Sequence, residues 1–153
     1  MGIATEIAEH INHLDNTIEE VFSMMMGIEC SPTDGVPVPR DKVTAVIGLA
    51  GSLSGAYIVN VTDSAALRIA GALMGMPATE VDDMVKDSIG EVCNMLAGGW
   101  KGRFPQLASE CMLSVPTIIE GKDCSVHMKQ SAVRIDRSYA FEDHSLTVSI
   151  HCE

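Results

Sequence analysis

The β-rich segments of this chain come in two groups, and helical segments separate the groups. The segments are residues 43–49 and 56–61, then 110–119, 124–135 and 146–152. Apolar residues recur at three- and four-residue steps in residues 3–26 and 82–102, which is typical of amphipathic helices, and a shorter helix is expected between Asp63 and Gly75. Strands gathered in this way, without a helix between each, favour an α+β fold. We expect a central, mostly antiparallel β-sheet packed against two long helices and a shorter one.

Turn-forming residues mark the connections between these elements. Gly51 and Gly55 bracket a turn that makes residues 43–61 a β-hairpin. Residues 31–39 contain three prolines, which exclude a helix and a central strand and leave a loop or an irregular edge. Residues 121–123 are expected to form a tight turn and residues 136–145 a longer, polar one.

Length and charge limit the possible functions. The 153 residues suit one domain, residues 1–153, and a 46% hydrophobic content is enough for a core. The net charge of −11 argues against binding to nucleic acid or to an anionic membrane surface. There is no apolar stretch of about 20 residues to span a membrane, and the N-terminus lacks the pattern of a signal peptide. We expect a cytoplasmic protein.

The cysteines are scattered and favour free thiols over disulfides or a metal site. They are Cys30, Cys93, Cys111, Cys124 and Cys152. Cys124 and His127, like His151 and Cys152, lie an odd number of positions apart in strand-like segments, so their side chains are expected to point to opposite faces. We therefore expect no zinc site and no cofactor. The methionines at positions 24–26, 74 and 76 are expected to fill gaps in the core, as is Cys93.

The helix predicted at residues 82–102 carries the most informative pattern. At about 100° per residue, one face is apolar and consists of Val85, Ile89, Val92, Leu96 and Trp100. The opposite face consists of Asp87, Glu91, Asn94, Gly98 and Lys101. Glu91 and Asn94 therefore point away from the core, one turn apart. Asn and Gly are poor helix formers, so we interpret Asn94 and the glycines at 90, 98 and 99 as leaving room for another protein surface.

Four stretches together resemble the CheX branch of the CheX/CheC chemotaxis phosphatase family. They are residues 44–55, 65–75, 88–98 and 115–121. The resemblance implies dephosphorylation of a CheY-type receiver domain, with the receiver supplying both the phospho-aspartate and its magnesium ion. It also implies that the acidic residue and the asparagine of the active helix are Glu91 and Asn94, and that the protein is a homodimer.

The chemistry agrees with these residue types. An acyl phosphate is a high-energy group, so hydrolysis needs a water placed in line with phosphorus rather than a protein nucleophile. An asparagine amide can both donate a hydrogen bond to that water and accept one from it. Glu91 would bind a basic side chain on the receiver and fix the docking. Ordering one water contributes about 2–4 kcal/mol, roughly 30- to 1,000-fold in rate.

Three alternatives stay open at this point. Glu9 and Asn12 have the same spacing and resemble the second site of CheC-type members, but we interpret their helix face as solvated. A non-catalytic adaptor of the same fold could bind a response regulator or a flagellar-switch partner without hydrolysis. The strand predicted at residues 146–152 ends the sequence, and as an uncovered edge it would favour pairing with a second copy.

Overall fold

A computed structural model describes residues 2–35, 41–122 and 133–153 of the chain. The described strands form one seven-stranded sheet with the order β1-β6-β7-β3-β2-β4, and β5 also pairs with β2. All the pairings are antiparallel. The strands are β1 Ser31–Thr33, β2 Asp41–Gly51, β3 Gly55–Thr62, β4 Cys111–Leu113, β5 Thr117–Lys122, β6 Val133–Phe141 and β7 His144–Cys152.

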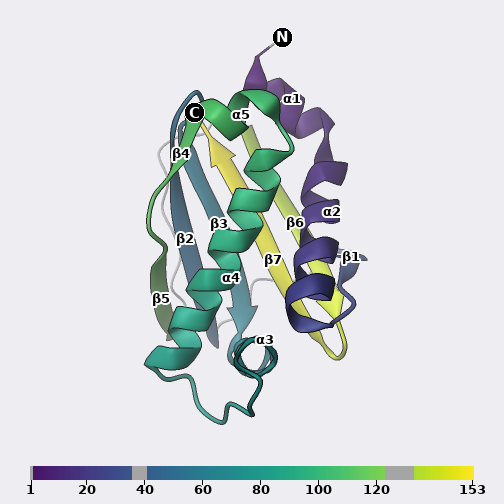
Figure 1. Cartoon of the computed structure of the whole chain (residues 1–153), viewed down its shortest axis with the longest axis vertical. Coiled ribbons are helices and arrows are strands. Elements are labelled where there is room, and N and C mark those ends of the chain that lie inside the picture. The colour runs from purple at the N-terminus through teal and green to yellow at the C-terminus, as the bar shows by residue number, and fades with distance from the viewer. Residues whose placement is uncertain (1, 36–40, 123–132) are drawn as a thin grey trace.

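The helices lie on one face of this sheet and at its two ends. Their bounds are α1 Ile3–Glu9, α2 Ile11–Val21, α3 Asp63–Met74, α4 Asp83–Gly102 and α5 Pro105–Glu110, with a π-helical turn η1 at Phe22–Met26. Figure 1 shows α2 and α4 crossing the same face of the sheet, α3 at one end, and α1 and α5 at the other. The expected α+β fold is confirmed, although the short helix α5 was not predicted.

The central hairpin forms as the glycines indicate. β2 and β3 pair from Lys42 opposite Thr62 to Leu49 opposite Gly55. A Cβ atom on Gly51 would overlap the carbonyl oxygen of Glu110, and one on Gly55 would overlap that of His151. Only glycine lets the neighbouring backbones approach this closely, so the two residues both end the strands and allow the sheet to pack around the turn.

The second group of strands differs from the prediction. The long polar turn expected at residues 136–145 is wrong, because β6 continues to Phe141 and a two-residue turn, Glu142–Asp143, leads into β7. Polar residues such as Asp136 alternate along β6 with apolar ones such as Tyr139, which is the pattern of a half-buried strand and not of a loop. The segment expected at 110–119 is divided between β4 and β5.

The order of the strands also corrects the expectation for the last strand. β7 is bonded to β6 on one side and to β3 on the other, so it is an interior strand and not an edge. The argument for self-association from an uncovered C-terminal strand is therefore wrong. The proline-containing segment 31–35 fits the expected irregular edge, since β1 is a three-residue strand at the border of the sheet.

Helices α3 and α4 begin at the capping residues that the sequence contains. The Thr62 hydroxyl accepts a hydrogen bond from the Ala65 N–H (3.1 Å), and the Asp82 carboxylate accepts one from the Val85 N–H (3.0 Å). Helix α3 ends at Gly75, which has the left-handed conformation with φ 72°. Local signals therefore fix where both helices lie along the chain.

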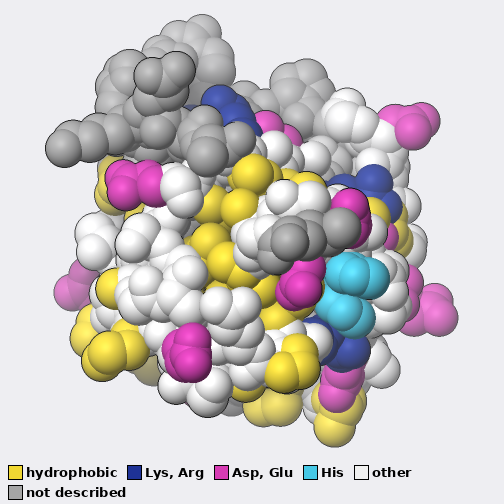
Figure 2. Space-filling view, turned by 90° about the horizontal axis from the view of Figure 1, so that it is seen from above, with side chains coloured by type: hydrophobic (Ala, Val, Ile, Leu, Met, Phe, Trp, Pro, Cys, Tyr) yellow, Lys and Arg dark blue, Asp and Glu magenta, His cyan; other side chains and the backbone are white. Residues whose placement is uncertain are grey.

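The single long helix predicted at residues 3–26 is wrong. The helix is interrupted at His10, where φ is −108° and ψ is 54°, and its last turn widens into η1. The segment contains neither glycine nor proline, so no local signal marks the interruption. A local contact and a tertiary contact accompany it: the His10 ring stacks on His13 with centroids 5.3 Å apart, and His13 packs edge-on against the distant Phe104 with centroids 4.9 Å apart. Figure 2 looks onto this end of the molecule, where histidine side chains gather.

An ion pair between Asp15 and Arg137 joins α2 to strand β6 of the sheet. Both carboxylate oxygens of Asp15 accept hydrogen bonds from Arg137 (3.0 and 2.7 Å), and the Tyr139 hydroxyl donates to the same group at 2.7 Å. Burial alone would raise the pKa of the Asp15 carboxyl, but these bonds and the charge of Arg137 outweigh burial, and the net pKa is lowered. The position of α2 therefore depends on a polar contact with β6 as well as on apolar packing.

Candidate functional site

Helix α4 divides into a buried and an exposed face, as its periodicity predicts. The residues of the apolar face are at most 3% exposed; they are Val85, Ile89, Val92, Leu96 and Trp100. Trp100 packs against Tyr57 and Phe104, with ring centroids 5.7 and 5.6 Å away. Because so much of one face is held in the core, the backbone that carries the opposite face is fixed in position.

Glu91 and Asn94 both lie on the exposed face of α4, where the sequence placed them. Asp87 is exposed beside them, and Gly98 and Lys101 are half-buried further along the same stripe. Within the described part of the chain, no hydrogen bond or ion pair engages the side chain of Glu91 or Asn94. The structure thus brings a carboxylate and an amide together on one rigid surface, with their bonding capacity unused.

The three glycines of α4 that were interpreted as clearance for a partner, Gly90, Gly98 and Gly99, serve different purposes, and two of them do not open the exposed face. Gly90 is buried, and a Cβ there would lie 3.2 Å from Ile118 Cδ1. A Cβ on Gly99 would lie 2.9 Å from Thr17 Cγ2, so this glycine lets α2 approach α4. Of these three, Gly98 is the one at which an added Cβ would meet no atom within 4 Å. The interpretation of all three as clearance for a partner is therefore wrong for Gly90 and Gly99.

Cys93 is a core residue and not a nucleophile. Its side chain is fully buried, and its thiol lies 3.9 Å from the carbonyl oxygen of Ala45. Burial raises the pKa of this thiol to about 12, so almost no thiolate forms at neutral pH. This agrees with its predicted role as a gap filler.

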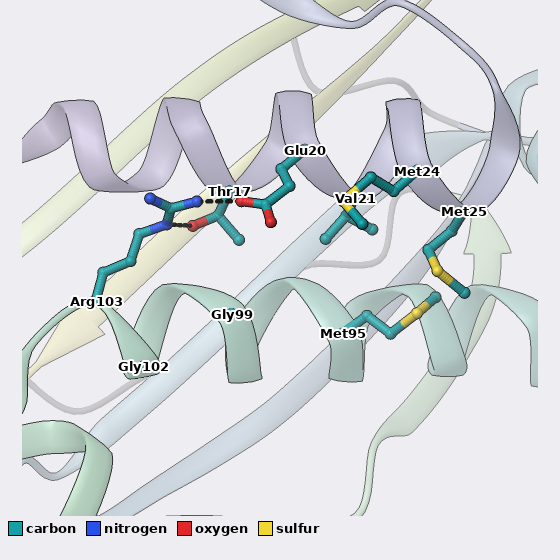
Figure 3. Close-up of a pocket in the computed structure, with 9 residues that line it drawn as sticks. All are labelled: Thr17, Glu20, Val21, Met24, Met25, Met95, Gly99, Gly102 and Arg103. Carbon is teal, nitrogen blue, oxygen red and sulfur yellow. Dashed lines mark hydrogen bonds and ion pairs between the residues drawn. The ribbon is translucent and has the colours of Figure 1, made fainter.

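A groove lies beside the candidate site, between α2 and η1 on one side and α4 on the other. Its volume is about 510 Å³, and Met24, Met25 and Met95 form much of its lining (Figure 3). Arg103 closes one end by donating to the Thr17 hydroxyl at 2.7 Å and pairing with Glu20 at 2.5 Å. The groove was not predicted, because its two walls are separated by about 70 positions in the sequence.

The methionines of this groove correct an expectation. Met24 is 73% exposed and Met25 is 50% exposed, so neither fills the core. The wider π-helical turn explains the difference, since the Gly27 N–H bonds to the carbonyl of Phe22, five residues back. The extra residue in the turn brings Met26 onto the core in place of Met25.

The second Glu-x-x-Asn pair is not presented in the same way. Glu9 is the last residue of α1, Asn12 lies in α2, and the interruption at His10 falls between them. Both side chains are exposed, as a solvated surface requires. The one-turn helical spacing that Glu91 and Asn94 share is therefore lost at this pair.

The described residues contain no cluster of three or more His, Cys, Asp or Glu side chains able to hold a metal ion. Cys124 and His127 lie outside the described residues, whereas His151 and Cys152 are successive residues of β7. In the same part of the chain, no helix has the length and apolar character needed to cross a membrane.

Comparison with known proteins adds to this geometry. A sequence model of the family described as chemotaxis phosphatase CheX matches residues 43–136, which include all of α4. A protein of Thermotoga maritima named CheY-P phosphatase CheX is 28% identical over 152 residues, covering 94% of this chain and 96% of the relative.

Two solved structures share the fold. The chemotaxis protein CheX from Vibrio vulnificus has a TM-score of 0.81 at 22% identity, with 94% of this chain and 95% of that one covered. A CheX-CheY-BeF3-Mg²⁺ complex from Borrelia burgdorferi has a TM-score of 0.78 at 23% identity, with 94% and 97% covered.

Proposed function

The chain belongs to the CheX family of chemotaxis phosphatases, and on that basis we propose that it hydrolyses the aspartyl phosphate of a CheY-type response regulator. The observation that carries the proposal is the pair Glu91 and Asn94, exposed and unengaged on one helix whose other face is buried. The name of the Thermotoga maritima relative and the CheY partner in the Borrelia burgdorferi complex support the choice of substrate.

Asn94 would position the attacking water. Its amide can accept a hydrogen bond from water through oxygen and donate one through nitrogen, which holds the water in one orientation. The buried residues on either side, Val92 and Leu96, keep the helix from shifting as the receiver docks. A water held in this way loses its freedom before the reaction and not during it, which lowers the barrier by about 2–4 kcal/mol.

Glu91 would fix the register of the docked receiver. It is exposed next to Asp87 in a chain with a net charge of −11, so this face attracts a basic side chain of the partner. One helical turn separates it from Asn94, so an ion pair formed by Glu91 places the amide at a set distance from the phosphoryl group. Its role is therefore binding and orientation.

The magnesium ion in this proposal belongs to the receiver. Bound there, it neutralises charge on the phosphoryl oxygens. The exposed stripe of α4 adds a carboxylate and an amide to that site, and we propose that the chain needs no cofactor of its own.

The test is phosphate release from a phosphorylated CheY-type receiver by the wild-type chain and by Asn94→Ala. We expect turnover to fall about 30-fold or more, with receiver affinity and thermal melting unchanged, because the side chain lies outside the core. Glu91→Lys should instead weaken receiver binding, with a loss that shrinks in high salt. Wild-type turnover by Asn94→Ala would rule out the water-positioning role. Binding without any hydrolysis by the wild-type chain would favour the adaptor.

We further propose that residues 1–153 form one domain, and that it pairs as a homodimer in the cytoplasm. The described residues share one sheet and one hydrophobic cluster, which supports a single domain. Cys30, Cys93, Cys111 and Cys152 are free and buried, as is usual in a reducing compartment. The homodimer rests on family resemblance, and a mass of 16.3 kDa by light scattering at micromolar concentration would contradict it.

A further inference from the structure

The groove between α2, η1 and α4 adjoins the Glu91–Asn94 stripe. Met95, which lines the groove, follows Asn94 directly in the chain. We propose that this groove binds an apolar side chain of the receiver domain and supplies much of the docking energy, an inference that rests on the proposed function. Glu91 would then orient the receiver and Asn94 would position the attacking water, while the groove would supply most of the binding.

The size of a protein interface supports this occupant. A stable complex buries about 800 Å² on each partner, which corresponds to a patch of roughly 16 Å radius. Helix α4 rises about 1.5 Å per residue, so the far end of the groove at Gly102 lies about 12 Å along the helix axis from Asn94, which is inside that radius. A receiver that covers Glu91 and Asn94 with an ordinary interface therefore also covers the groove.

The chemistry of the lining supports the same occupant. Met24 and Met25 are well exposed on one wall of the groove, and Met84, at 59% exposure, lies seven residues before Glu91 on α4. Apolar side chains thus flank the polar pair on two sides, an arrangement enriched in protein interfaces and unfavourable for a purely solvated surface. Methionine suits such a surface because its unbranched, polarisable side chain adapts to the contours of a partner.

The charges around the groove indicate what surrounds the apolar side chain. Arg103 is already paired with Glu20 and Thr17, so it does not counter the acidic groups of the neighbouring stripe. Asp87 and Glu91 remain exposed there. The complementary receiver surface therefore has an apolar side chain beside a basic one, the apolar one entering the groove and the basic one meeting Glu91.

The test compares exposed methionines at two places on the surface. Met112 on β4 is 73% exposed, as is Met24, so Met112→Ser is a matched control for the double variant Met24→Ser/Met25→Ser. The probe is a CheY-type receiver loaded with Mg²⁺ and beryllofluoride, which stands in for the phosphoryl group. With this probe we expect the double variant to raise the Kd about 10-fold or more; with the phosphorylated receiver as substrate, the KM should rise by a similar factor and kcat should stay within about twofold of wild type. Met112→Ser should bind like wild type.

The outcomes separate the groove from the proposed chemistry. A double variant that binds the loaded receiver as tightly as wild type overturns the groove proposal, and so does an equal loss in Met112→Ser. A wild-type chain that binds the receiver without releasing phosphate contradicts the proposed hydrolysis, while its Kd still tests the groove. All three substituted side chains are at least half exposed, and an unchanged thermal melt confirms that the fold is retained.

Discussion

The two long helical segments on the same face of the sheet both contain a glutamate followed three residues later by an asparagine, yet they present these residues differently. Helix α4 runs unbroken from Asp83 to Gly102 and holds Glu91 and Asn94 one turn apart. The N-terminal segment is interrupted between Glu9 and Asn12. The same short motif therefore has a defined geometry only where the opposite helix face is continuously buried, and rigidity of the support distinguishes a candidate site from a solvated surface.

The strongest test of that support removes buried volume from α4. Leu96 is fully buried, and Leu96→Ala should lower the free energy of unfolding by about 2–5 kcal/mol, because a cavity remains where the side chain packed. Chemical denaturation measures the loss. Asn94→Ala, two residues away on the exposed face, is the control and should unfold like wild type. A loss below about 1 kcal/mol for Leu96→Ala would mean that the core does not hold this helix.

A second test concerns the polar contact that seats α2. Asp15→Asn should lower the free energy of unfolding by about 1–3 kcal/mol at pH 7, because the charge that bonds Arg137 is lost. The pKa of Asp15 is lowered in the folded protein from its ordinary value of 3.8. Its contribution is therefore complete above that value and is lost as the pH falls through the folded pKa.

The difference in the free energy of unfolding between wild type and Asp15→Asn should be constant from pH 5 to 8 and should shrink below about pH 4. Urea denaturation of both proteins across this range measures it. A difference that grows as the pH falls would show that the carboxylate does not stabilise α2.

Substitutions at two neighbouring glycines, Gly98 and Gly99, test the contact between α2 and α4. Gly99→Ala should lower stability by about 1 kcal/mol net, since crowding against Thr17 outweighs the gain in helix propensity. Thr17 has little freedom to move, because its hydroxyl bonds the His13 carbonyl and Arg103. Gly98→Ala, with open space around it, should raise stability by about 0.5–1 kcal/mol. A change in melting temperature with the same sign for both variants would contradict the close approach of α2 to α4.

The smallest expected effect belongs to the interrupted pair. Asn12→Ala should leave both turnover and stability unchanged, with any shift within about 0.5 kcal/mol, because Asn12 is exposed and no unbroken helix joins it to Glu9. The measurement is the phosphate-release assay used for Asn94→Ala. A loss of turnover comparable with that of Asn94→Ala would show that the chain has a second working site and would remove the contrast between the two segments.

Elements whose signals are local could be predicted from the residues alone. The apolar period of residues 82–102 and the stretch between Asp63 and Gly75 placed α4, α3 and the exposure of Glu91 and Asn94, because each depends on residues within one or two turns. The hairpin of β2 and β3 followed from Gly51 and Gly55 in the same way.

Long-range packing set where the N-terminal helical segment is interrupted, which glycines face a neighbour, and which strands lie inside the sheet. The interruption at His10 has no glycine or proline to indicate it; His10 stacks on His13, and His13 contacts Phe104, 91 positions further along the chain. The π-helical turn that exposes Met25 begins at Phe22, whose ring packs against the distant Phe141 with centroids 5.3 Å apart, and β7 lies between β6 and β3 through pairings with both strands. The spacing of apolar residues along an element indicates which of its faces is apolar. Which other element covers that face is set by long-range packing.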